Sequence, residues 1–496
     1  MPATHAINVD LAKVWETPEG KGFLRTLVWG DAVEVLGVTP KHVEVRIRRV
    51  VEQPDGSFRA VQASGYICPP KSSRIRPQDV VVPLAENRVL KVSFVDVQQG
   101  DGAVIESPRG KVVLLDGGDN QLFARYLAAR YPGTSLDAPK DVDCIVVTHG
   151  DADHFAGLVE IHESESNAKR SKRLFLRPHR VYHNGLVKRP SKVDGKPVPE
   201  TEMLGRTRVV AGRKVVVELE EDLLAVDDGK MNKPFLAWKA ALGAYQKRAP
   251  IEFRRLAEGD DDAFAFLHDE GVAVEVLGPI ETSVDGKPGL RFLGEPKGPP
   301  GGNAPRFGGY SASHTINGHS IVLRLAYGGF RFLFAGDLNE ESQLDILTRS
   351  RDRLQADVFK VPHHGSADFS AGFLAAVAPV VSVVSSGDEN ARKEYIHPRA
   401  TLMGALGRAS RTAAPLVLVT ELVAFFEEKG FVDPERHVMK DGEAVIENGK
   451  AVTRRGVGSR FYAFRRTAFG MVKVRTDGRR LLVCTDSGNV QLKEAY

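Results

Sequence analysis

The run Thr148-His149-Gly150-Asp151-Ala152-Asp153-His154 is the most informative part of this sequence. It follows the apolar stretch DCIVV, which predicts a β-strand. Imidazole and carboxylate groups are the ligands that zinc and manganese take, and the run holds four of them within six residues. Because a turn after a strand can direct several side chains toward one point, the run predicts a metal site.

Two further segments carry possible metal ligands at the ends of predicted strands. Asp337 follows FRFLFAG, although an aspartate at such a place more often caps a turn or a helix. His363 and His364 follow DVFKVP. Since adjacent residues of a strand point to opposite sides, one histidine can reach a metal while the other faces the substrate. The sequence does not decide which of the two does so.

The segments around these motifs alternate between strand and helix patterns. LKVSFVDV, KVVLLDGG and DCIVVT predict strands, and FARYLAARY between the last two predicts a helix. SIVLRLAYGGFRFLFAGD predicts a strand hairpin, followed by a helix at ESQLDILTRS. Near the C-terminus, MVKVRT and RRLLVCT flank an Asp-Gly turn, which is a strong hairpin signal. This alternation indicates a layered α/β architecture.

The ends and the middle of the chain have different patterns. Five short β-type runs lie between residues 8 and 68, so we predict a small all-β barrel at 1–75, similar to SH3-like domains of bacteria, and a proline-marked linker at 76–87. Residues 88–496 form the main domain, with insertions around 160–315. Within them, KPFLAWKAALGAYQKR and PIEFRRLAEG predict helices, and the Gly- and Pro-rich 283–314 predicts a long loop.

Composition places the protein among ordinary globular chains. The 496 residues are 42% hydrophobic and 27% charged, and the net charge of +4 does not by itself argue for nucleic acid. The three cysteines are far apart, which favours free thiols in a reducing compartment. The N-terminal residues lack a signal-peptide pattern, and the longest apolar run is interrupted by Pro379. We therefore expect a cytoplasmic protein without membrane contact.

The motifs occur in an order that resembles the metallo-β-lactamase superfamily and, within it, the hydrolase domain of the ComEC competence-protein family. VDVQQGDG, LDGG, NGHSIVLRL and HP, at residues 95–102, 115–118, 317–325 and 397–398, resemble that family's DVGQGDA, IDGG, NNxSxVLRL and GHP. These landmarks cover roughly residues 90–400. The resemblance implies an αββα sandwich and metal-dependent hydrolysis, and it bears more on fold than on substrate.

The resemblance also implies roles for individual residues. Two divalent ions, zinc or manganese, would share the candidate ligands His149, Asp151, Asp153, His154, Asp337, His363 and His364. Asp116 and Asn317 would support these ligands through hydrogen bonds, and Asp101, Asp153 and His397 would take part in catalysis.

In this assignment His149 and Asp151 hold one ion, and Asp337 bridges both. Asp151 stands where the superfamily commonly has a histidine, so the site is oxygen-rich and manganese stays open beside zinc. The superfamily's third histidine has no clear counterpart here. The candidates are His183, His314 and His319, each of which is more often a histidine that binds no metal.

A stretch rich in lysine and arginine runs from Lys169 to Lys214. Such a run is usually a solvated face. The alternative is a basic rim beside the metal site that would bind a polyanionic substrate such as nucleic acid. In that case Lys169, Arg170, Lys172 and Arg173 are the candidate contacts.

Three functions are compatible with these patterns. The leading hypothesis is a phosphodiesterase or nuclease in which two metal ions activate a bridging hydroxide. The second is an esterase or phosphoesterase of small molecules. The third is a metal-binding scaffold without catalysis, in which the SH3-like barrel recruits a protein partner.

Overall fold

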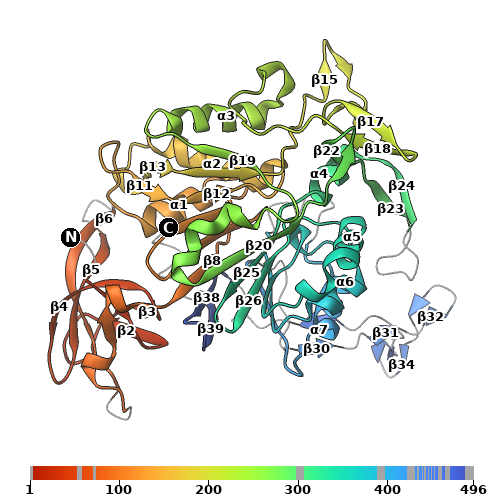
Figure 1. Cartoon of the computed structure of the whole chain (residues 1–496). Helices are drawn as coiled ribbons and strands as arrows, with labels where there is room; N and C mark the ends of the chain where they lie inside the picture. Colours follow the sequence, from red (N-terminus) through yellow and green to blue (C-terminus); the bar gives the residue numbers. More distant parts are fainter. Residues whose placement is uncertain are drawn as a thin grey trace.

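The computed structural model describes residues 4–52, 58–70, 74–297, 306–387, 397–421 and 470–485, together with short strands between 430 and 463 (Figure 1). The N-terminal strands form one seven-stranded antiparallel sheet in the order β3-β2-β6-β5-β4-β1-β7. Each strand contributes to one apolar cluster that includes Ile7, Val14 and Val45. The strands are β1 (His5–Ile7), β2 (Leu11–Trp15), β3 (Phe23–Val28), β4 (Ala32–Val38), β5 (Val43–Glu52), β6 (Phe58–Ile67) and β7 (Val81–Pro83).

The stretch 76–87 was expected to be a linker, but part of it belongs to this small all-β unit. Strand β7 pairs with β1, with Val81 opposite Ile7. Val80 and Val81 are buried in the apolar cluster of the unit. Burial of these two side chains outweighs the prolines on either side, which suggested an open connection. Residues 71–73, near the end of the predicted barrel at 1–75, lie outside the described part of the chain.

The main part of the chain is built on two sheets that pack face to face. The first has eight strands in the order β19-β14-β12-β10-β9-β8-β38-β39. Its bounds are β8 (Leu90–Phe94), β9 (Gly102–Glu106), β10 (Val112–Asp116), β12 (Cys144–Val146), β14 (Arg180–His183), β19 (Glu252–Arg255), β38 (Val472–Thr476) and β39 (Leu481–Thr485). Its central strands read as continuous apolar runs because both of their faces are covered.

The second sheet has six strands in the order β20-β25-β26-β27-β28-β29. Its bounds are β20 (Val272–Gly278), β25 (Val322–Tyr327), β26 (Phe330–Phe334), β27 (Val358–Lys360), β28 (Val381–Val384) and β29 (Leu416–Val419). Leu90, Phe94 and Ile105 of the first sheet share one apolar cluster with Leu323 and Phe334 of the second. This cluster is the inner core of the sandwich.

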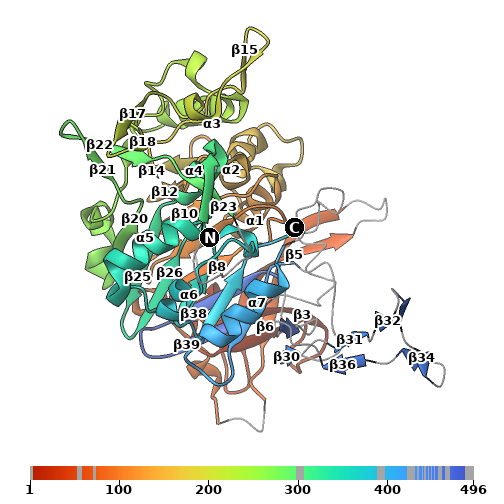
Figure 2. The ribbon, with the colours of Figure 1, turned by 90° about the vertical axis from the view of Figure 1, so that its right-hand side faces the viewer.

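Helices cover the outer face of each sheet, which completes four layers (Figures 1 and 2). Helices α1 (Leu122–Arg130), α2 (Ala152–Ser164) and α3 (Lys233–Gln246) share a cluster with the first sheet. Helices α5 (Glu340–Ser350), α6 (Ala371–Val377) and α7 (Ala400–Ala409) share one with the second. The αββα sandwich that the motifs implied is therefore the observed architecture. Among the described residues, no helix is long and apolar enough to cross a bilayer.

The predicted range of the insertion, 160–315, is too long. Strands β14, β19 and β20 lie inside it, and all three belong to the two main sheets. PIEFRRLAEG, expected as a helix, contains β19, which pairs in parallel with β14 along Glu252–Arg255. Pairing at the sheet edge overrides the helix preference of its arginine and glutamate residues. KPFLAWKAALGAYQKR is helical, as predicted, and contains α3.

The stretch 283–314, expected as a long loop, also contains regular structure. Strands β21 (Thr282–Val284) and β22 (Lys287–Arg291) form a hairpin. Its turn is Asp285-Gly286, and both residues have a positive φ, 52° and 77°. Asp-Gly is the preferred pair for this turn type, so the signal was present in the sequence. Strands β23 (Gly294–Lys297) and β24 (Arg306–Tyr310) pair as well, and helix α4 (Ala312–Gly318) follows.

Two small hairpins complete this side of the molecule. They are built from β15 (Lys192–Val193) with β16 (Lys196–Pro197), and from β17 (Thr207–Val210) with β18 (Arg213–Val216). Figures 1 and 2 show β15, β17 and β18 grouped near β22 and α4, at one end of the sandwich.

Candidate metal centre

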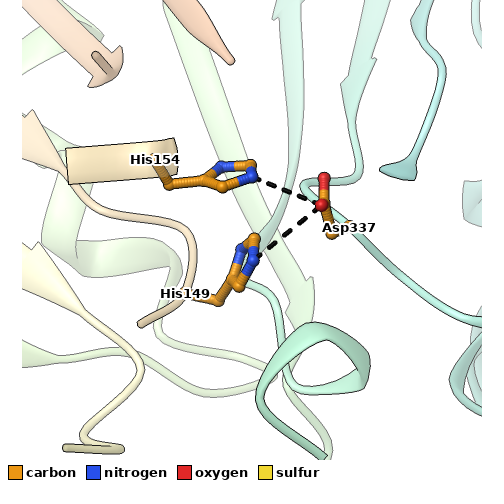
Figure 3. A group of neighbouring side chains, drawn as sticks. All are labelled: His149, His154 and Asp337. Carbon is orange, nitrogen blue, oxygen red and sulfur yellow. Dashed lines mark ion pairs between the residues drawn. The ribbon is translucent and has the colours of Figure 1, made fainter. Parts of the chain in front are cut away.

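The candidate ligands come from loops at one edge of the two packed sheets. His149 follows β12, and His154 lies in the first turn of α2. Asp337 follows β26 of the second sheet, and His364 follows β27. Figure 3 shows the side chains of His149, His154 and Asp337 pointing toward one another across the gap between the sheets. Carboxyl ends of strands in the two sheets thus bring together residues nearly 200 positions apart in the chain, from 149 to 337.

Two overlapping groups of side chains have the spacing that a metal ion needs. In the first, Asp337 Oδ2 lies 3.9 Å from His149 Nε2 and 3.3 Å from His154 Nε2. In the second, His364 Nε2 lies 3.4 Å from Asp153 Oδ2, with His154 nearby. Asp337 links the groups, because its Oδ2 also lies 3.0 Å from His364 Nε2. Four of the five side chains are 0% to 4% exposed, which keeps bulk water away from this region, and the fifth, Asp153, is 24% exposed.

The nitrogen atoms that face this point have no hydrogen-bond partner. His149 Nε2, His154 Nε2 and His364 Nε2 are all buried and unpartnered, as is Asp337 Oδ1. Unsatisfied buried polar atoms are costly and therefore rare in folded proteins. Imidazole nitrogens and a carboxylate that converge in this way fit a divalent cation, which would satisfy them together.

Hydrogen bonds hold His154 in the orientation that a ligand needs. Asp116 Oδ2 lies 2.9 Å from His154 Nδ1, which leaves Nε2 free to face the centre. Asp116 also accepts from the backbone N–H of Thr148 at 2.8 Å and from its hydroxyl at 2.7 Å. Its own backbone has a left-handed φ of 57° at the end of β10. The support that the motifs implied for Asp116 therefore has a matching geometry.

The electrostatics of the two central histidines differ. Burial lowers the pKa of His149 well below its ordinary value, so this imidazole is neutral, the form that binds a metal. Burial also opposes protonation of His154, but Asp337 and Asp116 raise its pKa well above the ordinary value. A bound cation would displace that proton, since it interacts with the same carboxylates.

Residues 95–230 match the family model of the Metallo-beta-lactamase superfamily. This part of the chain is similar to metallo-β-lactamase domains, and the molecule has the metallo-β-lactamase fold. The match contains the run from His149 to His154 and ends before Asp337. The four-layer arrangement of the two sheets agrees with it.

Two bacterial competence proteins are similar over short segments. The chain is 41% identical to the competence protein ComA of Neisseria gonorrhoeae over 83 residues, and 32% identical to ComE operon protein 3 of Bacillus subtilis strain 168 over 95 residues. These segments are 16% and 19% of this chain, and they span 12% of the length of each relative. They support a partial likeness to the ComEC type and say nothing of the remaining parts of those proteins.

Solved structures with a similar arrangement are distant. One is a Thermotoga maritima protein assigned as a zinc-dependent hydrolase of the superfamily, with a TM-score of 0.20 and 11% identity over 59% of this chain and 74% of that one. Another is CmlA, a diiron β-hydroxylase of Streptomyces venezuelae, with a TM-score of 0.27 and 13% identity over 66% and 52%. Scores this low leave the fold assignment to the family match and the sheet topology.

The structure brings only one of the two adjacent histidines into the metal-ligand groups of the metallo-β-lactamase domain. This is His364, whose backbone has a left-handed φ of 51°. His363 is partly buried, and its Nε2 lies 3.5 Å from the side-chain amide of Asn317. Left-handed backbone in a residue that is not glycine is strained, and such strain collects at functional sites.

Asp101 and Lys360 form a buried ion pair beside His364. Asp101 Oδ1 lies 3.4 Å from His364 Nδ1, and Lys360 Nζ lies 4.0 Å from Asp337 Oδ1. Burial would raise the pKa of Asp101, but Lys360 and His364 hold it below its ordinary value. Sequence reasoning missed Lys360, although a lysine inside the apolar strand VFKV is an unusual choice that could have pointed to it.

Asp151 does not belong to the groups that contain His149 and His154. Its Oδ1 accepts from Lys188 Nζ at 2.9 Å. With the Asn317 amide in the orientation that satisfies its neighbours, the Asn317 nitrogen donates to Asp151 Oδ2 at 2.9 Å. Among the described residues, no group suited to a metal ion includes Asp151. Lys188 lies within the basic stretch Lys169–Lys214 that the sequence suggested as a rim, although it was not among the four residues chosen as contacts.

The candidates for a third histidine ligand are engaged elsewhere. His183 Nε2 lies 3.2 Å from the Glu221 carbonyl oxygen, and His319 Nε2 lies 2.7 Å from that of Arg291. Burial lowers the pKa of His183 and of His319 to about 4. His314 Nε2 lies 3.2 Å from Asp368 Oδ2. None of the three belongs to a metal-ligand group of the described residues.

His397 lies near the centre, on the side of His363, with 6.1 Å between the two ring centroids. Burial and the nearby His364 lower its pKa to about 4, so its imidazole is neutral.

The four basic residues chosen from the sequence lie far from the metal-ligand groups. Helix α2 begins at the centre and ends at Ser164, before Lys169 and the short helix Arg170–Lys172. Because an α-helix rises about 1.5 Å per residue, Ser164 lies about 15 Å from His154. Arg173 also donates to the Asn167 carbonyl at 2.5 Å. Lys169, Arg170, Lys172 and Arg173 therefore do not line the candidate centre.

Proposed function

We propose that this protein is a metal-dependent hydrolase that cleaves phosphodiester bonds. One observation carries the proposal. Three buried imidazole nitrogens and a carboxylate, from His149, His154, His364 and Asp337, converge without hydrogen-bond partners in a metallo-β-lactamase domain. Members of this superfamily are usually metal-dependent hydrolases, and the donor set fits a divalent cation such as zinc or manganese.

The protein's own residues prepare the site for this chemistry. When bound, a divalent ion acts as a Lewis acid and lowers the pKa of water. Asp116 orients the ring of His154 through a hydrogen bond. Lys360 and Asp101 form a buried ion pair, which holds the Asp101 carboxylate beside His364. His397 is neutral and lies beside the centre, so it can accept a proton or contact the leaving group. Because these groups are buried, they need little rearrangement when the substrate binds.

The choice of a phosphodiester is supported by charge and by partial likeness. Lys188 lies at the centre, and its side chain is 20% exposed. The hairpins that follow it carry exposed Lys192, Lys196, Arg206 and Arg208, so this end of the molecule favours an anionic substrate. The chain is also partly similar to a competence protein and to ComE operon protein 3, over 12% of the length of each. We therefore place nucleic acid first among the substrate classes.

A small ester is the second candidate substrate, and one observation favours it. His149, His154, Asp337 and His364 are each no more than 3% exposed. A site this deep admits a small molecule more readily than a folded polynucleotide.

Hydrolysis assays with the full-length chain test the proposal. We expect cleavage of a chromogenic phosphodiester and of single-stranded DNA that requires added manganese or zinc. His364→Ala should lower this activity roughly 100-fold or more, because it removes a metal-facing nitrogen from the centre. The control is His268→Ala, since His268 is exposed and lies on the separate helix Asp261–Glu270. Full activity of His364→Ala, or cleavage that persists in excess chelator, would contradict the proposal. Turnover of small esters without any polynucleotide cleavage would favour the second substrate.

A further inference from the structure

The candidate centre has one side at His149 and Asp151 and another at Asp153 and His364. The carboxylates of the two sides differ in the protein groups that contact them. Asp151 is held at both oxygens, by Lys188 at 2.9 Å and by the Asn317 amide at 2.9 Å. Asp151 is also the N-cap residue of α2, but its side chain accepts no hydrogen bond from the helix. Its carboxylate is therefore oriented by Lys188 and Asn317. A metal ion at Asp151 would have to displace an ammonium group.

The same side also lacks a second histidine ligand. Among the described residues, the only metal-ligand group that contains His149 is the one with His154 and Asp337. The other histidines in reach of this side, His183 and His319, are buried and bonded to backbone carbonyls. An ion between His149 and Asp151 would have Asp337 as its third protein ligand and, among the described residues, no fourth, which is at the low end of the three or four ligands of zinc sites.

The opposite side is better suited to an ion. Asp153, His154 and His364 form a group of their own, and Asp337 Oδ2 lies 3.0 Å from His364 Nε2. The Nε2 atoms of both histidines are buried without a hydrogen-bond partner. Asp153 is kept in place by Gln99, whose amide donates to Oδ2 at 3.0 Å. Among the described ion pairs no lysine reaches Asp153, and the nearest lysine of this side, Lys360, pairs with Asp101 and lies 4.0 Å from Asp337 Oδ1, the carboxylate oxygen that does not face the histidines.

We infer that this site binds one divalent ion tightly, at Asp153, His154, Asp337 and His364, and that Lys188 takes the place of a second ion beside Asp151. The inference rests on the metal binding in the proposed function and changes the expectation of two equivalent ions. Lys188 and Asp151 are 20% and 24% exposed at their side chains, so the ammonium group borders the space open to a substrate. In that position it can meet an anionic oxygen of the substrate, as a second metal ion would.

Metal stoichiometry of the full-length chain tests this inference without any measurement of activity. The protein is loaded with zinc or manganese, freed of excess metal by gel filtration, and analysed by elemental mass spectrometry and by native mass spectrometry during titration. We expect about one retained ion per chain in the wild type. Lys188→Met keeps most of the side-chain volume and removes the charge, so the affinity for a second ion should rise roughly 10- to 100-fold, because the ion no longer has to break a charge-assisted hydrogen bond to Asp151.

Two controls separate the charge of Lys188 from other effects. Lys188→Arg keeps the positive charge and should still retain about one ion. Lys192→Met removes an exposed lysine of the neighbouring hairpin and should behave like the wild type. If Lys188→Met does not fold, titration of the wild type alone is decisive, because the inference requires two classes of site with clearly different affinities.

Three results would overturn the inference: two ions of equal affinity in the wild type, unchanged stoichiometry in folded Lys188→Met, or no bound ion at all. The first two leave the proposed hydrolase function intact, whereas the third also removes its basis. A stoichiometry that follows the expected pattern in a protein without hydrolytic activity would support the inference and contradict the proposed function.

Discussion

At the level of single residues, His183 has a hydrogen-bond pattern that only a neutral imidazole satisfies. Its Nδ1 accepts from the backbone N–H of Gly185 at 3.1 Å, and its Nε2 lies 3.2 Å from the Glu221 carbonyl oxygen. Protonation would put a hydrogen on Nδ1 and break the first of these bonds. Burial accordingly lowers the pKa of His183 to about 4.

This lowered pKa predicts a loss of stability at mildly acidic pH. Between pH 6.5 and about 4 the unfolded chain binds a proton at His183 that the folded chain does not bind, so the free energy of unfolding falls as the pH falls. Above pH 6.5 the contribution is fully present. Across the window it amounts to roughly 3 kcal/mol, from about 1.4 kcal/mol per pKa unit.

Thermal unfolding between pH 4.5 and 7.5 measures this effect. His183→Gln cannot titrate, so its unfolding temperature should depend less steeply on pH than that of the wild type. His268→Gln, at an exposed position, is the control and should keep the wild-type slope. Identical slopes for wild type and His183→Gln would show that His183 is not responsible.

The sequence predicted which residues meet at the centre better than it predicted how each is used. His149, Asp153, His154 and Asp337 stand at strand or helix ends, where their types and order are informative. The contacts of Asp151 with Lys188, and of Asp101 with Lys360, could not be read from the chain because they join loops far apart in sequence. Whether a carboxylate faces an ion or a lysine depends on such long-range packing.

At the level of elements, helix α2 is attached to the loop after β10 by direct backbone contact. Gly117 N–H donates to the His154 carbonyl at 2.7 Å, and Gly157 N–H donates to the Gly118 carbonyl at 2.8 Å. A Cβ atom at Gly157 would lie 1.9 Å from the Gly117 carbonyl oxygen. Because Gly157 has no side chain, α2 can lie close to the loop after β10. This close contact brings His154 to the centre.

Gly157→Ala should move α2 outward and destabilise the protein. Overpacking of this kind costs about 1–3 kcal/mol, and it should also weaken metal binding because Asp153 and His154 lie on the same helix. The matched control is Gly243→Ala in α3, where a Cβ meets nothing within 4 Å. That change should stabilise the helix by about 0.5–1 kcal/mol. The unfolding temperature and the metal affinity of both variants give the comparison, and equal effects would refute the role of close contact.

Elements with strong periodicity were predictable, and short edge strands were not. The hairpin of β25 and β26 and the helix α3 follow from long apolar patterns. β14 and β19 are four residues each, and their place in the first sheet is determined by their neighbours. For the same reason the extent of the insertion was overestimated.

At the level of the whole molecule, the N-terminal all-β unit is fixed to the first sheet by charged side chains with little exposure. Asp31 lies 4.0 Å from Arg130 of α1 and 3.9 Å from Arg475 of β38. Arg130 pairs in turn with Glu106 of β9 at 2.7 Å, and Glu106 lies 3.7 Å from Lys91 of β8. Burial would raise the pKa of Asp31, but Arg130 and Arg475 hold it below its ordinary value. This network links the two β-rich parts of the molecule. An N-terminal unit that served only to recruit a partner, on a loose tether, would not require such ion pairs to the main domain.

Asp31→Asn should therefore destabilise more than the small unit alone. The change keeps the shape of the side chain but leaves the 3%-exposed Arg475 without this carboxylate, and breaking a buried pair costs roughly 3–5 kcal/mol. The control is Asp10→Asn, because Asp10 and Arg480 form an exposed pair, 61% and 55% exposed, whose removal costs less than about 1 kcal/mol.

Hydrogen exchange followed by mass spectrometry would locate the effect: we expect faster exchange in β8 and β9 for Asp31→Asn only. Unchanged exchange in these strands, with loss of protection confined to residues 4–83, would mean that the N-terminal unit folds independently and is free to act as a recruiting module.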